Sequence, residues 1–116
     1  MDATEEIQGK LIRCERPDWE PLCDLIGDSL AGWFMWMAEV ELDDGTAVHL
    51  YKHRETRQYV HLDASGRAFD YRPEHTYTRL AAATAIKRAF TGRGRALLTP
   101  SDKAALRAAI ARAPAA

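Results

Sequence analysis

The sequence predicts an α+β fold: a four-stranded antiparallel meander with one helix before it and two helices after it. Apolar and polar residues alternate through residues 33–72, and turn residues interrupt the alternation at three points, which is typical of strands joined by hairpins. Apolar residues at helical spacing flank this region on both sides. Amphipathic helices and an apolar sheet face need one another to form a core, so we expect the helices to pack on one sheet face.

The chain has 116 residues, which is the size of one domain. We therefore expect a single domain over 1–116, with a short N-terminal arm at 1–10 and a C-terminal tail at 113–116. The segment IQGKLIRC is compatible with a brief strand or an extended arm. Cys14 and Cys23 match neither a redox pair nor a zinc knuckle, and we expect both thiols to be reduced.

The first helix is predicted over 17–31, with a break at Gly27. A proline and an acidic first turn mark its start, as is common at helix N-termini. Its apolar residues recur at helical spacing: Trp19, Leu22, Leu25, Ile26 and Leu30.

The meander is predicted from an apolar set of even-numbered residues. Neighbouring antiparallel strands share a face only if their loop lengths keep that parity, so we expect three-residue loops at DDG, RET and ASG. Gly45 and Gly66 stand where such loops need a left-handed residue. The expected strands are 33–42, 46–53, 58–63 and 67–72.

The two C-terminal helices follow Pro73. Leu80, Ala83, Ile86 and Phe90 lie on one helical stripe, which predicts a helix over 76–91 that stops at Gly92. Thr99 as N-cap, with proline in the next position, predicts a last helix that runs to about Arg112.

The odd-numbered face of the meander is the candidate site, because Tyr, Met and His are favoured at interfaces over the usual polar residues of a wet face. Its residues are Met35, Met37, Glu39, His49, Tyr51, His53, Tyr59, His61 and Tyr71. We expect this face to form a homo-oligomer, most simply a dimer, or to bind a small-molecule ligand. A plain solvated face that stabilises the sheet remains the alternative.

Within this face, the expected register places Glu39, His49 and His61 in one row. Two imidazoles and a carboxylate are a known metal-ligand set and are also suited to acid/base chemistry. A small enzyme or metal-dependent protein is therefore an alternative reading. No nucleophile, phosphate-binding or dinucleotide motif supports it, so we favour a non-enzymatic module with no cofactor and no metal.

Charge is unevenly distributed along the chain. Residues 1–71 hold 7 basic against 15 acidic residues and residues 72–116 hold 9 against 2, which gives the overall charge of −1. The basic residues Lys87, Arg88, Arg93 and Arg95 raise nucleic-acid binding as a further alternative, but no nucleic-acid motif accompanies them.

The acidic N-terminus has no secretory pattern, and no apolar run reaches the ~20 residues that span a bilayer. We therefore expect a cytoplasmic protein with no membrane partner. The Ala-, Arg- and Asp-rich composition is typical of a GC-rich bacterial genome.

Overall fold

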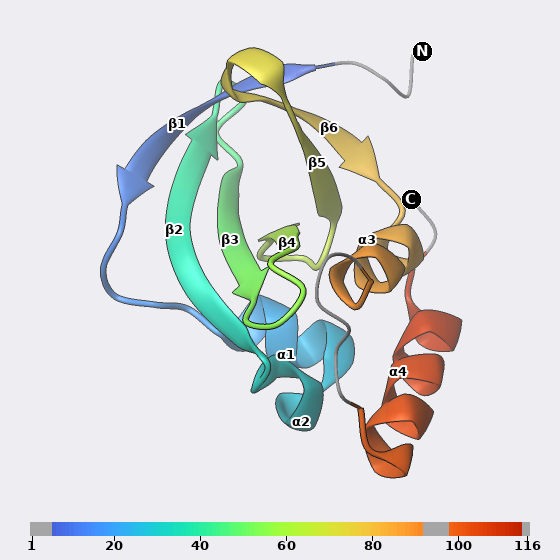
Figure 1. The fold of residues 1–116 in the computed structure, drawn as a ribbon. Coiled ribbons are helices and arrows are strands. Elements are labelled where there is room, and N and C mark those ends of the chain that lie inside the picture. Colours follow the sequence, from blue (N-terminus) through green and yellow to red (C-terminus); the bar gives the residue numbers. More distant parts are fainter. Residues whose placement is uncertain (1–5, 92–97, 115–116) are drawn as a thin grey trace.

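The computed structural model describes residues 6–91 and 98–114, and its centre is a closed antiparallel barrel of six strands (Figure 1). Each strand pairs with its neighbour in the chain, and the first strand also pairs with the last. The strands are β1 (Ile7–Arg13), β2 (Phe34–Leu42), β3 (Ala47–His53), β4 (Tyr59–Asp63), β5 (Ala68–Arg72) and β6 (Thr76–Leu80).

The helices lie outside the barrel, with α1 and α2 below it and α3 and α4 beside it in the view of Figure 1. Gly27, with a φ of 88°, separates α1 from α2, which confirms the predicted break. The Thr99 hydroxyl accepts a hydrogen bond from the Asp102 amide, which confirms the predicted cap of α4. The helices are α1 (Glu20–Ile26), α2 (Asp28–Ala31), the 3-10 turn η1 (Pro73–His75), α3 (Ala82–Ala89) and α4 (Pro100–Arg112).

The predicted four-stranded meander is wrong in strand number and topology. Residues 7–13, of which 7–10 were expected to be an arm, form β1 between β2 and β6. Residues 76–80, expected to begin a helix, form β6. Leu80 fits the helical stripe by spacing, but TYTRL also alternates as a strand does. Pairing with β1 and β5 decides between the two patterns. Both partner strands lie outside residues 76–91, over which the helix was predicted.

Two of the three predicted hairpin turns are confirmed. Gly45 and Gly66 have φ values of 89° and 86°, and each donates its amide to the carbonyl three residues earlier. The carboxylate of Asp63 further holds the second turn, since it accepts hydrogen bonds from Ser65 and Arg67.

The turn between β3 and β4 is one residue longer than predicted. The amide of His53 bonds the carbonyl of Gln58, so four residues form the loop. Arg57 takes the left-handed position with a φ of 65°, although glycine is the residue that usually signals it. The extra residue reverses the parity of the pairing, and His49 lies opposite Leu62 instead of His61.

A bulge between Trp36 and Ala38 makes a second parity change, in β2. Together these shifts give the barrel an inner and an outer apolar face. The inner cluster holds Val40, Leu42, Val48, Phe69 and Tyr77, with Ile7 and Leu50 against it. The outer cluster joins Phe34, Tyr51, Val60 and Leu62 to the buried faces of the helices.

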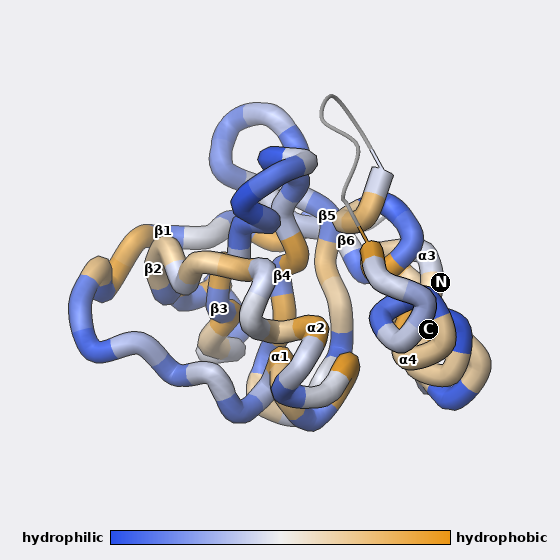
Figure 2. Tube along the Cα trace, turned by 60° about the horizontal axis from the view of Figure 1, so that its bottom comes forward, coloured by the Kyte–Doolittle hydropathy of each residue, from blue (hydrophilic) through white to orange (hydrophobic). Residues whose placement is uncertain are grey.

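Figure 2 shows hydrophobic stretches along the strands and helices, while the segment joining β1 to α1 is largely hydrophilic. Among the described residues, no helix has both the length and the apolar character needed to cross a bilayer.

Candidate ligand-binding site

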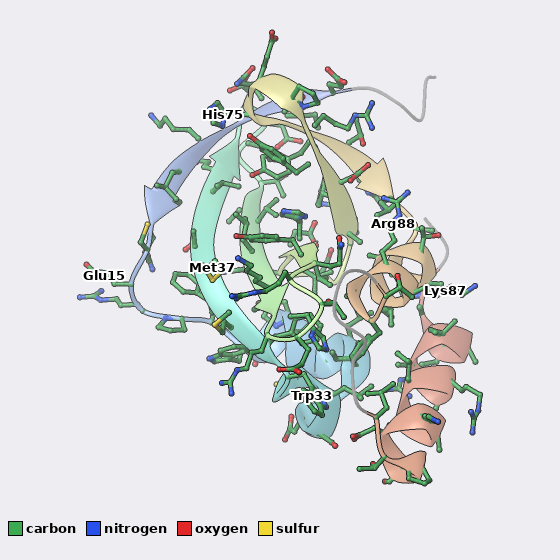
Figure 3. All side chains as sticks on the ribbon, in the orientation of Figure 1. Glu15, Trp33, Met37, His75, Lys87 and Arg88 are labelled. Atoms are coloured by element: carbon green, nitrogen blue, oxygen red, sulfur yellow. The ribbon has the colours of Figure 1, made fainter. Side chains whose placement is uncertain are left out.

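The structure divides the predicted His/Tyr/Met face between the two sides of the barrel wall. Because of the four-residue loop, His49, Tyr51 and His53 point outward, while Tyr59 and His61 point inward. Tyr71 also faces inward. Met37 lies midway along β2 at the bulge (Figure 3), with 37% of its surface exposed, and Met35 is half-buried.

The outward residues form a packed polar cluster. The Trp36 indole donates a hydrogen bond of 3.2 Å to Nδ1 of His49, so the proton of this imidazole resides on Nε2. That nitrogen lies 3.7 Å from the Asp18 carboxylate. Tyr51 donates its hydroxyl to the Asp18 carbonyl at 2.7 Å. These contacts fasten the segment before α1 to the barrel wall.

His53 is fully buried outside the barrel. Its Nδ1 accepts the amides of Glu55 and Thr56, and its Nε2 has no hydrogen-bond partner among the described residues. The ring is enclosed by Trp33, Phe34 and Phe90. Burial lowers the pKa of His53 and outweighs the opposing charge of Glu55, so this imidazole is a neutral part of the core.

The inward residues line an open cavity of about 400 Å³ inside the barrel. All six strands and η1 contribute to its wall, which consists of Gly9, Leu11, Val40, Leu50, Tyr59, His61, Tyr71, His75 and Tyr77. Figure 3 shows side-chain rings gathered inside the barrel below the turn that carries His75. Close-packed interiors have few voids larger than a water molecule, so this volume is an unfilled space with room for a small molecule.

The inner part of the cavity is buried and the rim is exposed. His61 and Tyr77 are 8% and 3% exposed, whereas Leu11, Tyr59 and Tyr71 are 57%, 38% and 45% exposed. A mostly apolar and aromatic lining with a few polar groups is the usual composition of a small-molecule site.

Gly9 makes room for one of the cavity rings. A Cβ atom at this position would lie 2.6 Å from Cε1 of Tyr77 and 3.1 Å from a methyl group of Leu42. The bare backbone of β1 therefore lets the Tyr77 ring lie against it. The ring in turn packs edge-on against His61 and Tyr71, with centroids 5.6 Å and 5.4 Å away.

The turn η1 holds His75 at the rim at a cost in backbone strain. Glu74 and His75 are consecutive left-handed residues, with φ values of 66° and 62°, and neither is glycine. The side-chain amide of Gln8 donates to the Glu74 carbonyl at 2.8 Å. The Tyr71 hydroxyl lies 3.2 Å from Nδ1 of His75. Strain of this kind is typical of functional sites.

The interior of the cavity disfavours charge. Burial lowers the pKa of His61 to about 4, although the Phe69 carbonyl and Asp70 both oppose the shift. Burial also raises the pKa of Tyr77, with a further contribution from Tyr71. At neutral pH both side chains are therefore uncharged hydrogen-bonding groups.

The expected row of Glu39, His49 and His61 does not come together. Glu39 lies beside His49 in the sheet, but its carboxylate pairs with Arg13 at 3.7 Å, and His61 is on the other side of the wall. Within residues 6–91 and 98–114, no group of three or more His, Cys, Asp or Glu side chains is arranged to hold a metal ion.

Lys87 and Arg88 lie in the last turn of α3, away from the turn that carries His75 (Figure 3). One guanidinium nitrogen of Arg88 is 3.6 Å from the Asp70 carboxylate, so part of its charge is compensated within the fold. Arg93 and Arg95 lie outside the described residues.

Sequence reasoning missed six of the nine cavity residues, namely Gly9, Leu11, Val40, Leu50, His75 and Tyr77. Val40 and Leu50 were expected in the core under the helices. The alternation of TYTRL was the signal for Tyr77, and a glycine inside the alternating segment IQGKLIR was the signal for a close approach at Gly9. His75 follows from neither pattern.

Comparison of the chain with models of protein families, with curated proteins and with solved structures found no match.

Proposed function

We propose that this protein is a non-enzymatic binding module that holds a small, largely apolar molecule inside its barrel. The observation that carries the proposal is the cavity of about 400 Å³ to which every strand contributes a side chain. Its volume lies within the range of small-molecule sites, and its mostly apolar and aromatic wall with a few polar groups fits such a ligand.

Two details support a function for the cavity beyond imperfect packing. β1 has a glycine, Gly9, where it faces the cavity. A glycine inside a strand weakens the strand, so this residue is not explained by the stability of β1. The η1 turn places His75 at the rim with two consecutive residues in strained left-handed conformations. Neither feature strengthens the barrel by itself.

The proposal is tested with N-phenyl-1-naphthylamine, an uncharged probe that becomes fluorescent in apolar sites. We expect saturable binding of one probe per chain. Leu50→Trp adds bulk to the cavity wall and should weaken binding by at least about tenfold. Leu106→Trp makes the same change on a half-buried leucine of α4, outside the cavity, and should bind as the unmodified protein does.

Two outcomes would contradict this function. One is the absence of saturable binding by a folded protein. The other is equal affinity in the Leu50→Trp variant, which would place the probe elsewhere. Exciting the probe directly, at wavelengths beyond tryptophan absorption, keeps the introduced indoles out of the signal.

Self-association is the second candidate, and the exposed apolar rim supports it. Leu11, Tyr59 and Tyr71 are large side chains with more than a third of their surface exposed around one opening. Exposed clusters of this type are often buried between two copies of a chain. Light scattering after size exclusion tests it: a dimer that Tyr59→Ser and Tyr71→Ser together convert to a monomer supports this candidate, and a monomeric unmodified protein contradicts it.

A further inference from the structure

We propose that the cavity selects an uncharged aromatic molecule that carries one hydrogen-bonding group, with its rings inside the barrel and that group at the Tyr71–His75 pair. This inference rests on the proposed function of the cavity and goes beyond it by naming the chemical class of the ligand.

The first argument is the absence of ionised groups from the wall. The nine lining residues include no Asp, Glu, Lys or Arg. A charged ligand would lose its hydration without gaining a partner of opposite charge, which is costly in an apolar site. Burial that keeps the His61 imidazole neutral acts in the same direction on any cation inside the cavity.

Lys52 is a cation in contact with one of the cavity residues, Tyr59. Its ammonium group lies over the Tyr59 ring, 5.7 Å from the centroid, and it does not line the cavity. A carboxylate inside the barrel would therefore compete with an existing contact of Lys52 instead of meeting a free charge. An aromatic carboxylate is therefore the most demanding comparison for the affinity of an uncharged ligand, because it is the charged ligand that Lys52 could favour.

The second argument is the arrangement of the rings. Tyr59 and His61 stand nearly parallel, with an interplanar angle of 9° and centroids 5.5 Å apart. Tyr77 meets His61 at 69°. The wall thus presents both ring faces and ring edges. An aromatic ligand gains from offset and edge-to-face contacts at these separations, and a saturated ring does not.

The third argument is the hydrogen-bonding capacity of the rim pair. With the His75 imidazole in either of its uncharged tautomers, this ring and the Tyr71 hydroxyl carry one polar proton each, and the 3.2 Å contact between them uses one of the two. In one tautomer the other proton is on Nε2 of His75, and in the other it is on the Tyr71 oxygen. In both cases the pair keeps one donor and one acceptor, which suits a hydroxyl or an amide.

A matched series of naphthalene probes tests the inference by calorimetry or ligand-observed NMR. We expect 2-naphthol to bind about fivefold more tightly than decahydro-2-naphthol, which has the same carbon skeleton without aromatic rings. It should bind at least about tenfold more tightly than 2-naphthoate and 2-naphthylmethylammonium, the anionic and cationic members of the series. The difference in affinity between 2-naphthol and naphthalene measures the contribution of the ligand hydroxyl to binding.

The rim pair is tested with Tyr71→Phe. This variant should lower the affinity for 2-naphthol about fivefold and leave naphthalene within about twofold, because only the hydrogen bond is lost. Thr91→Val removes an exposed hydroxyl from a residue that does not line the cavity and should change neither affinity. Tyr71 is 45% exposed, so its substitution leaves the fold intact, which a thermal melt verifies.

The outcomes separate this inference from the function on which it rests. Saturable binding of N-phenyl-1-naphthylamine together with equal affinities across the naphthalene series overturns the inference and leaves the binding function in place. Tighter binding of the carboxylate or the ammonium compound overturns it as well. Failure of every probe to bind overturns the binding function itself.

Discussion

The pKa of the His61 imidazole depends strongly on the side chains around it. The residue faces the cavity from β4 and is 8% exposed, among the rings of Tyr59, Tyr71 and Tyr77. These neighbours offer no carboxylate in direct contact with the ring, and the nearest acidic influence is that of Asp70. The folded protein therefore binds a proton at His61 far less readily than the unfolded chain does.

This difference predicts a pH dependence of stability. The folded pKa of His61 is about 4, against an ordinary value of 6.5. The unfolded chain takes up the proton first as pH falls, so stability is complete above about pH 6.5 and is lost progressively down to about pH 4. The full shift corresponds to ~3 kcal/mol. His61→Leu should flatten the dependence by about this amount, as measured by urea unfolding at several pH values between 7 and 4.

His53 contributes to the same slope, because burial also lowers its pKa. The informative quantity is therefore the difference between the unmodified protein and His61→Leu. Parallel profiles for the two proteins would show that His61 is as easily protonated in the fold as in water.

Asp63 changes stability in the same direction as His61, but at lower pH, because its folded pKa is also below the unfolded value. Burial alone would raise its pKa, but hydrogen bonds from Ser65 and Arg67 outweigh this and lower it. Its contribution to stability is present above the unfolded pKa near ~3.9 and disappears only as pH falls through the lower folded value. The two groups therefore act in successive pH ranges.

At the scale of the elements, the loop between β3 and β4 decides which side chains enter the barrel. Its buried residue Thr56 donates its hydroxyl to the Ala89 carbonyl at the end of α3. The loop is also held by His53, which accepts two of its amides. This anchoring fixes a four-residue loop and hence the parity of β4.

Thr56→Val preserves the shape of the side chain and removes the bond to α3. The Ala89 carbonyl loses this bond in a buried environment, so we expect a loss of about 1–3 kcal/mol in the free energy of unfolding. Chemical denaturation measures it. Thr91→Val is the matched control, because the exposed Thr91 hydroxyl also bonds α3 carbonyls but water replaces it. Equal losses of unfolding free energy in the two variants would show that the buried hydrogen bond of Thr56 stabilises the fold no more than the exposed one of Thr91.

The same loop explains how much of the site was predictable. The hairpins with Gly45 and Gly66 were correct because glycine marks the left-handed position in each loop. In the middle hairpin Arg57 holds that position, and arginine gives no such signal. A one-residue error followed, and it placed His49 and His61 on one face instead of two.

Errors at the ends of the fold have a different cause. The alternation within 7–13 and 76–80 is short and mixed, and both segments become strands by pairing with partners outside themselves. β1 pairs with β2 and β6, and β6 pairs with β5 and β1. Local periodicity carries no information about such pairs. The helix α4 and the break at Gly27, which depend on local signals, were predicted correctly.

At the scale of the whole molecule, Gly9 connects closure of the barrel with the cavity. Gly9→Ala would bring a methyl group to 2.6 Å from the Tyr77 ring, so the ring must move. We expect a loss of about 1–3 kcal/mol in stability from this overpacking, together with weaker binding of N-phenyl-1-naphthylamine. Thermal unfolding and the probe titration measure the two effects.

Gly32→Ala is the control for this prediction. Its φ of −61° is open to any residue, and the nearest atom to an added Cβ is 3.4 Å away. Alanine there should be neutral or slightly stabilising. If Gly9→Ala behaved in the same way, the glycine would not be needed for the position of Tyr77.

The seam between β1 and β6 has a further consequence for how long a ligand stays bound. Within the described residues it consists of two paired positions, Ile7 with Tyr77 and Gln8 with Thr76, and both of its strands border the cavity. Short, marginally held elements open locally far more often than the whole domain unfolds. Parting of these two strands would widen the opening of the cavity, so the residence time of a bound molecule would depend on the stability of the barrel as well as on the contacts that the molecule makes.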